Sequence, residues 1–208
     1  MPPRFVAEQL SHPRGVRGWL VRRGMNRGNA HANAFALDQL DLQPTDRVLE
    51  IGFGGGPNIQ RLLRHGASVV GVDRSRDSVA AADHRFARER AAGRARFIIG
   101  DVGALPLADS TFTKAVTVHT VYFWSSLEQG FLELHRCLQP GGLLAVGFLP
   151  KAQMDLIGMP ADLFTTRAPS AVGSAAANVG FIVNTRRPEG SAQWIVLLCR
   201  KARHEQSA

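Results

Sequence analysis

A cluster of glycines directly after a short apolar run is the first feature that could bind a ligand. The run Val48–Ile51 leads into glycines at positions 52, 54, 55 and 56, and Pro57 follows. Glycine allows positive φ and close approach of the backbone to a ligand. Proline suits the first position of a helix, because its missing N–H would be unpaired there. The sequence therefore predicts a glycine-lined turn between a buried strand and a helix, where open α/β sheets bind nucleotides.

The spacing within this turn argues against two common phosphate-binding loops. A dinucleotide fingerprint G-x-G-x-x-G beginning at Gly52 requires glycine where this chain has Pro57. A P-loop requires Gly-Lys-Ser/Thr, and the first lysine of the chain is Lys114. Both a nicotinamide oxidoreductase and a P-loop nucleotidase are therefore disfavoured. Arg74 directly after Asp73 is the one feature that still fits a nicotinamide cofactor.

Two acidic residues stand where two later strands are expected to end. Asp73 lies 21 residues after Gly52, and Asp101 lies in the Gly-Asp-Val at 100–102. A carboxylate at the position of Asp73 can accept hydrogen bonds from both hydroxyls of a ribose. Since the carboxyl ends of parallel strands share one edge of a sheet, the glycine turn and both acids are predicted to face one crevice.

A later segment combines a histidine with three aromatic residues. His119 is followed closely by Tyr122, Phe123 and Trp124. Histidine titrates near pH 6.5, so His119 can hold or release a proton at neutral pH, or it only packs against a ligand. The aromatic residues predict either a wall for a flat or apolar molecule or a hydrophobic plug under the sheet. His31 is a second candidate base, or a surface histidine of a helix.

These residues need a scaffold of alternating strands and helices. Nearly continuous apolar runs predict strands, most of them buried on both faces, at 47–51, 67–72, 96–99, 115–118, 143–148, 181–185 and 194–199. Helix-compatible segments lie at 58–65, 76–92, 127–138 and 168–179. This alternation predicts an α/β, Rossmann-like fold with a seven-stranded, mostly parallel sheet and helices on both faces. The Arg-Pro-Glu-Gly-Ser between the last two strands predicts a C-terminal antiparallel hairpin.

The domain organisation follows from the same pattern and from composition. Residues 1–42 are expected to form an N-terminal helical arm or lid, and residues 43–208 a single domain. The 208 residues are 45% hydrophobic and 20% charged, which is enough for a full core. No apolar stretch approaches the roughly 18 residues of a membrane span, and no secretory signal is seen, so a cytoplasmic protein is expected. Cys137 and Cys199 suit neither a disulfide framework nor a metal site, and no metal is expected.

The formal net charge of +8 bears on the choice of partner. Six arginines stand among the first 30 residues against one acidic residue, Glu8. Such a segment fits an anionic partner such as nucleic acid, or it reflects an arginine-rich composition on a solvated helix face. Because the arginines are dispersed, the second reading is favoured and nucleic acid is not the expected partner.

Four motifs, in this order, resemble those of class I S-adenosylmethionine-dependent methyltransferases. They are Glu-Ile-Gly-Phe-Gly-Gly-Gly at 50–56, the strand-ending Asp73, Gly-Asp-Val at 100–102 and Leu-Gln-Pro-Gly-Gly at 138–142. The resemblance covers about residues 45–150, and the terminal hairpin fits the seven-stranded fold of that family. A looser match, Met-Asn-Arg-Gly-Asn at 25–29, resembles the helix that closes over the cofactor in ubiquinone-pathway-like members.

The resemblance implies S-adenosylmethionine as the cofactor. Glu50 would support the network at its amino group, and Gly52, Phe53 and Gly54 would let the backbone approach its methionyl part. Asn29 would lie in the segment that closes over it.

The nucleoside part of the cofactor has its own set of implied residues. Asp73 would bind the ribose hydroxyls, with Arg74 beside the adenine. Asp101 would bond the adenine amino group, and the Val102 backbone its ring nitrogen.

The predicted function is methyl transfer to a small aromatic or lipophilic acceptor through oxygen, nitrogen or carbon. His119 would be the general base, and His31, Tyr122, Phe123 and Trp124 would contact the acceptor. With only about 19 residues at 149–167, the acceptor site is expected to be open or covered mainly by residues 1–42. An RNA-modifying methyltransferase and a non-catalytic S-adenosylmethionine-binding protein are the alternatives. Oligomeric state is not predicted.

Overall fold

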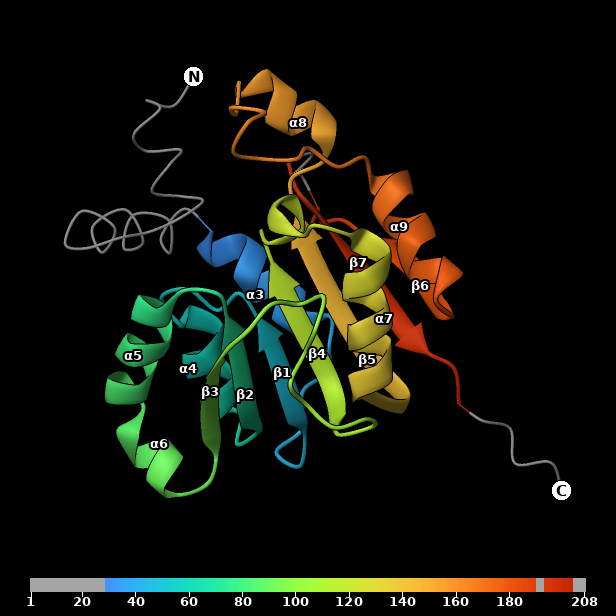
Figure 1. Cartoon of the computed structure of the whole chain (residues 1–208). Helices are drawn as coiled ribbons and strands as arrows, with labels where there is room; N and C mark the ends of the chain where they lie inside the picture. The colour runs from blue at the N-terminus through green and yellow to red at the C-terminus, as the bar shows by residue number, and fades with distance from the viewer. Residues whose placement is uncertain (1–28, 190–192, 204–208) are drawn as a thin grey trace, which may run out of the picture.

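Seven strands form one sheet in the computed structural model, which describes residues 29–189 and 193–203 (Figure 1). The strand order is β3-β2-β1-β4-β5-β7-β6. The strands are β1 (Arg47–Ile51), β2 (Ser68–Asp73), β3 (Ala95–Ile99), β4 (Phe112–Val118), β5 (Leu138–Phe148), β6 (Phe181–Arg186) and β7 (Ile195–Lys201). Strands β1 to β5 pair in parallel, and β7 runs antiparallel between β5 and β6. This confirms the predicted mostly parallel sheet with its antiparallel C-terminal hairpin.

Helices cover both faces of this sheet. They are α3 (Ala30–Asp38), α4 (Pro57–Arg64), α5 (Arg76–Arg85), α6 (Ala87–Ala91), α7 (Leu127–Cys137), α8 (Lys151–Leu156) and α9 (Pro169–Asn178), with a 3₁₀ turn η1 (Val121–Phe123). Helices α3, α4 and α5 pack on one face, and α7 and α9 on the other. In the described part of the chain, no helix is both long and apolar enough to cross a membrane.

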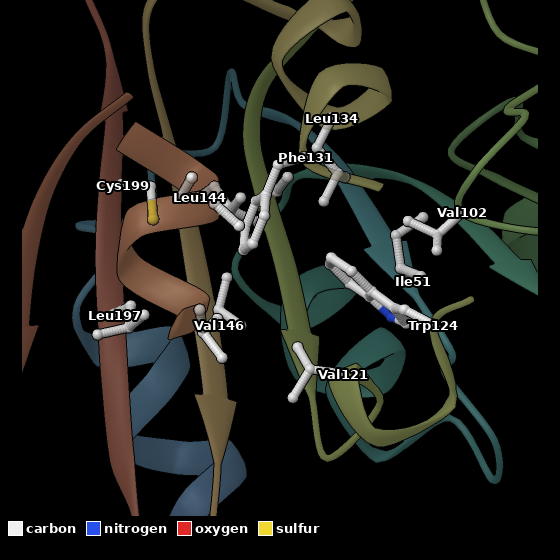
Figure 2. Packing of buried hydrophobic residues seen from close by; sticks show 14 of the residues in the cluster. Ile51, Val102, Val121, Trp124, Phe131, Leu134, Leu144, Val146, Leu197 and Cys199 are labelled. Carbon is white, nitrogen blue, oxygen red and sulfur yellow. The ribbon is translucent and has the colours of Figure 1, made fainter. Parts of the chain in front are cut away.

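Alternate residues of each central strand enter one of two hydrophobic cores. In β1, Val48 faces the α3–α4 side, whereas Leu49 and Ile51 face the α7 side. Figure 2 shows the second core, where Phe131 of α7 lies against the sheet. Phe131 is fully buried, and burying a phenylalanine contributes about 1.5–3 kcal/mol. Burial on both faces explains why the strands read as continuous apolar runs.

The structure corrects several predicted element boundaries, and β4 begins at Phe112 rather than 115. The helix expected at 76–92 is broken at Phe86, whose backbone leaves helical geometry while its buried ring packs 5.7 Å from that of Phe97. Strand β5 begins at Leu138 rather than 143, because Leu138 already pairs with Phe112. A bulge follows, in which Gly141 adopts a φ of 81°.

Two further segments differ from expectation or lie outside it. The segment 149–167 contains an unpredicted helix, α8. Of the predicted arm at 1–42, residues 1–28 lie outside the described residues, and the rest forms α3 and the connection to β1.

A glycine in β2 is expected to be intolerant of a side chain. A Cβ on Gly71 would lie 2.7 Å from Cδ1 of Phe53 and 3.0 Å from Cδ1 of Phe97. We expect Gly71→Ala to lower the free energy of unfolding by about 1–3 kcal/mol, because overpacking displaces these rings. Gly173→Ala in α9 is the control, since its Cβ would approach only Val183 at 3.9 Å and alanine favours the helix. Urea denaturation should show a lower free energy of unfolding for Gly71→Ala and a higher one for Gly173→Ala. Equal changes in the two variants would contradict this account.

Candidate active site

A cleft of about 750 Å³ opens at the carboxyl ends of β1, β2 and β4, beside the start of α3. It brings together most of the residues that the sequence singled out. Those lining it are Asn29, Glu50, Gly52, Phe53, Gly54, Asp73, Arg74, Asp101, Val102, His119, Phe123 and Trp124. His31 and Tyr122 are not among its lining residues. His31 is exposed on α3, and Tyr122 is buried beneath the cleft.

The glycine-rich turn joins β1 to α4 at the bottom of the cleft. Gly52, Gly54 and Gly56 have φ values of 69°, 52° and 72°, which L side chains rarely adopt. The N–H of Gly52 donates to Val72 O at 2.7 Å, tying the turn to β2. A Cβ on Gly54 would meet no atom within 4 Å. The backbone of Gly54 is therefore open to close approach by a ligand.

Asp73, at the end of β2, holds this turn in place. Its Oδ2 accepts the Gly54 N–H at 2.8 Å, and its Oδ1 accepts the Ser75 N–H at 2.9 Å. Hydrogen bonds to an ionised carboxylate are about twice as strong as neutral ones. One carboxylate thus connects the glycine turn to the beginning of α5, where Ser75 caps the helix.

Glu50 forms a buried polar cluster with Asn58 of α4 and Asn33 of α3. Asn58 Nδ2 donates to Asn33 Oδ1 at 3.3 Å, and all three side chains are at most 8% exposed. Burial raises the pKa of Glu50 to about 8, a hydrogen bond with Asn58 lowers it, and the Asp73 charge raises it. Glu50 Oε2 and Asn58 Oδ1 have no hydrogen-bond partner. Two buried oxygen atoms without a partner beside a cleft suit a ligand that donates hydrogen bonds, once the Glu50 carboxyl has lost its proton.

Helix α7 holds the loop that carries Asp101 and Val102. Asp101 Oδ1 accepts the Gly103 N–H at 2.9 Å. Gln129 of α7 donates to Gly103 O at 3.2 Å, and Glu133 accepts the Leu105 N–H at 2.7 Å. Asp101 is exposed, whereas the Val102 side chain is buried.

Arg74 spans the cleft from β2 to the aromatic segment. Its Nη1 donates to Phe123 O at 3.5 Å, although the side chain is largely exposed. The contact places a cation beside Asp73 and next to the aromatic residues. Sequence reasoning did not anticipate this link, because the two residues are 49 positions apart.

His119 directly follows β4 and has a left-handed backbone, with a φ of 59°. Its Nδ1 lies 3.3 Å from the Tyr122 hydroxyl, and its N–H donates to Gly147 O at 2.8 Å. The Tyr122 hydroxyl in turn accepts the Leu149 N–H. Burial lowers the pKa of His119 to about 4, so its imidazole is neutral at pH 7.

His119→Asn is expected to remove a pH dependence of stability. Folded His119 protonates near pH 4 and an unfolded histidine near 6.5, so wild-type stability falls as pH drops from 6.5 to 4. Over this pH range we expect the free energy of unfolding of the variant to fall by about 1–2 kcal/mol less than that of wild type. This figure allows for the partial exposure of the His119 side chain. Asparagine tolerates the left-handed backbone. Urea unfolding at pH 7 and pH 4.5 measures the difference, with exposed His84→Asn as control; parallel curves for wild type and His119→Asn would contradict it.

The aromatic residues divide between the cleft and the core. Phe123 lines the cleft and packs 5.1 Å from Phe164 of the 149–167 segment. Tyr122 packs 6.2 Å from Phe164, and the Thr165 N–H donates to Tyr122 O. The segment 149–167 thus packs against the aromatic residues. Most of residues 1–42, which were predicted to cover an otherwise open acceptor site, lie outside the described residues.

Several polar residues that line the cleft were not predicted from the sequence, among them Asn33, Asn58 and Thr120. None of these three carries a spacing signal of its own. For Asn58, a polar residue on the otherwise apolar inner face of a helix was the available hint. Within the described residues, no group of three or more His, Cys, Asp or Glu side chains is placed to hold a metal ion.

Comparison with known proteins shows which family this chain resembles. The methyltransferase domain family matches residues 49–146. The uncharacterized methyltransferase YdaC of Bacillus subtilis is 30% identical over 59% of this chain and 67% of its own length. A sterol 24-C-methyltransferase of Pneumocystis carinii is 31% identical over 55% and 30% of the two chains. A demethylmenaquinone methyltransferase of Corynebacterium kroppenstedtii is 32% identical over 52% and 44%. The matched stretch thus spans about a third to two thirds of these curated relatives.

Solved structures share the fold at low identity. The [4+2]-cyclase SpnF superposes with a TM-score of 0.71 at 18% identity, covering 83% of this chain and 81% of that one. Geranyl diphosphate methyltransferase, solved in complex with SAM, gives 0.70 at 15% identity, covering 84% and 85%. Sheet order, glycine turn and strand-ending acid define a Rossmann-like methyltransferase fold. The chain belongs to the class I S-adenosylmethionine-dependent methyltransferases, and S-adenosylmethionine is its cofactor.

The residues of the cleft fit this cofactor. The open backbone at Gly54 suits close approach of a ligand, and Asp73 stands at the strand end suited to a ribose. The partnerless oxygens of Glu50 and Asn58 suit an ammonium group, which only donates hydrogen bonds and pairs with the ionised carboxylate. Each of these features suits a chemical group that S-adenosylmethionine carries.

Proposed function

We propose that this protein transfers the methyl group of S-adenosylmethionine to a small lipophilic acceptor that binds beside Phe123. The aromatic cluster at the end of β4 carries the proposal. Phe123 lines the cleft and packs against Phe164 at 5.1 Å and Tyr122 at 6.0 Å. Aromatic surfaces bind flat apolar molecules by burying their area.

The named activities of two relatives support the same class of acceptor. One is a sterol methyltransferase and the other a demethylmenaquinone methyltransferase. Both names denote ring compounds of largely apolar character. The shared fold alone does not select methyl transfer, because a [4+2]-cyclase has it too.

Methyl transfer mainly requires that the acceptor be positioned correctly relative to the methyl group. S-adenosylmethionine supplies an activated methyl group on a sulfonium. Holding an acceptor in line with that bond contributes about 7–11 kcal/mol in favourable cases. Phe123 and the covering segment with Phe164 would orient an apolar acceptor and exclude water.

His119 is the proposed general base. It lines the cleft, and its lowered pKa of about 4 leaves the ring unprotonated and able to accept a proton at neutral pH. The Tyr122 hydroxyl, 3.3 Å from Nδ1, would orient the ring. A base at this place suits a hydroxyl or neutral nitrogen acceptor.

A transfer assay with methyl-labelled S-adenosylmethionine tests the proposal. Acceptors would be prenylated hydroquinones, simple phenols, sterols and bulk transfer RNA. We expect transfer to an apolar acceptor, a kcat lowered about 10²–10⁴-fold in His119→Asn, and S-adenosylmethionine affinity retained in that variant. Phe123→Ala should raise the KM for the acceptor more than the Kd for the cofactor.

Two results would contradict this function. Labelling of transfer RNA alone, with a steep loss on adding salt, would favour an RNA-modifying enzyme. Cofactor binding without transfer to any acceptor would favour a non-catalytic binding protein.

A further inference from the structure

We propose that Thr120 is a positioning residue that holds the Trp124 indole as a fixed wall of the S-adenosylmethionine cleft. The inference rests on the proposed function but concerns only its cofactor half, not the choice of acceptor. Thr120 and Trp124 both line the cleft, and Trp124 is 5% exposed.

A chain of hydrogen bonds runs from the indole to the end of β1. Trp124 Nε1 donates to Thr120 Oγ1 at 3.1 Å, and the hydroxyls of Thr120 and Thr117 bond to each other. Thr117 Oγ1 donates to Ile51 O at 3.1 Å. Since an indole N–H only donates and a carbonyl only accepts, the Thr120 hydroxyl must donate to Thr117. Each hydrogen bond in this series therefore has a defined donor and a defined acceptor.

Burial makes this chain dependent on the Thr120 hydroxyl. Thr117 is 1% exposed and Trp124 is 5% exposed, so both side chains depend on a protein partner for their hydrogen bonds. Without the central hydroxyl, the indole N–H loses its acceptor and Thr117 loses its donor. Leaving buried polar groups unpaired is unfavourable, so the ring is expected to leave its place.

Two glycines make room for the same pair of side chains. A Cβ on Gly52 would lie 2.5 Å from Thr120 Cγ2, and a Cβ on Gly130 would lie 2.6 Å from Trp124 Cε3. The indole also packs edge-on to Phe131 at 5.3 Å. Figure 2 shows the ring lying between Phe131 and the side chains of Ile51 and Val102. Thr120 therefore touches the glycine-rich turn directly, and links it to the wall formed by Trp124.

A wall that is already ordered saves the free energy of ordering it when the ligand binds. Loss of the Thr120 hydroxyl should therefore raise the Kd for S-adenosylmethionine without removing any cleft-lining ring. The methyl of Thr120 would remain against Gly52 in a valine variant. The hydroxyl alone is thus the tested group.

The test compares Thr120→Val with Thr120→Ser. Both are made in a background where Trp19 and Trp194 are phenylalanine, which leaves Trp124 as the single tryptophan of the three in the chain. Calorimetry gives the Kd for S-adenosylmethionine and S-adenosylhomocysteine, and acrylamide quenching gives the freedom of the indole. Exposed Thr185→Val in β6 is the control.

We expect Thr120→Val to raise both Kd values at least fivefold and to increase quenching of Trp124, with Thr120→Ser and the control within twofold of wild type. Wild-type binding and quenching in Thr120→Val would overturn the proposal. So would a Thr120→Ser variant as impaired as the valine variant. If Thr120→Val does not fold, Trp124→Phe removes the donor from the other end, and unchanged binding there would overturn the proposal. Because binding is the readout, failure of the acceptor assay affects only the proposed function.

Discussion

Glu50→Gln is expected to stabilise the free protein above pH 5 and to weaken S-adenosylmethionine binding. The folded protein holds the Glu50 proton up to about pH 8, whereas an unfolded glutamic acid ionises near 4.5. Unfolding of wild type therefore releases a proton between these values, so wild-type stability falls as pH rises through this window. Glutamine does not titrate. The free energy of unfolding of the variant should therefore exceed that of wild type by an amount that grows by up to about 1.4 kcal/mol per pH unit and reaches a few kcal/mol at pH 8.

The same substitution is expected to impair the cofactor site. A carboxylate can pair with an ammonium group, and a charged hydrogen bond contributes about 1.5–3 kcal/mol, which corresponds to a loss in affinity of about 10- to 150-fold. Because wild-type Glu50 must ionise to make that pair, binding at pH 7 should release a proton. Calorimetry in two buffers of different ionisation enthalpy measures this release.

Exposed Glu128→Gln, on the first turn of α7, is the matched control and should change stability and affinity little. A Glu50→Gln variant that is less stable than wild type at pH 8 would contradict the raised pKa. Unchanged affinity for S-adenosylmethionine would contradict the assigned role. Opposite effects on stability and binding are expected where a buried group serves function.

Asp73→Asn is expected to lower S-adenosylmethionine affinity by about 100-fold or more. The carboxylate accepts two backbone N–H groups, at 2.8 Å from Gly54 and 2.9 Å from Ser75. Asparagine has one acceptor oxygen and one NH₂ group, which only donates. One of these two backbone N–H groups would therefore face the NH₂ group and lose its acceptor. The variant loses both the ordered turn and the charged acceptor for a ribose, two effects of about 1.5–3 kcal/mol each.

Adenosine as a competing ligand separates the two acidic residues. It carries the ribose but no ammonium group, so Asp73→Asn should weaken it and Glu50→Gln should not. Exposed Asp38→Asn in α3 is the control. Equal losses of adenosine affinity in both acidic variants would mean that the cleft collapses as a whole, against the separate roles argued above.

That the glycine turn and the strand-ending acids line one cleft was predictable, because the signals for them are local. Glycines that need positive φ follow an apolar strand, as Gly52 and Gly54 do. Asp73 follows the next strand in the same way, and parallel strands bring such ends to one edge. The class of protein and the cofactor followed from these short motifs.

The lining proposed for the acceptor was less predictable because it depends on contacts distant in sequence. Tyr122 and Phe123 are adjacent in the chain, yet one is buried and the other lines the cleft. Their difference arises from the 3₁₀ turn and from Phe164, about 40 residues later. Periodicity does not indicate where such a turn directs neighbouring side chains.

The strand-and-helix alternation, the glycine turn and the acids at the strand ends could be predicted from residues near one another in the chain, because backbone sterics and hydrophobic periodicity are local properties. The position of β7 between β5 and β6 depends on the folded arrangement of the whole sheet. So do the cluster of Asn33 and Asn58 around Glu50 and the link from Trp124 through Thr120 to β1. Hydrogen-bond pairing and the desolvation that sets a pKa depend on which residues meet in space, and packing alone brings these together.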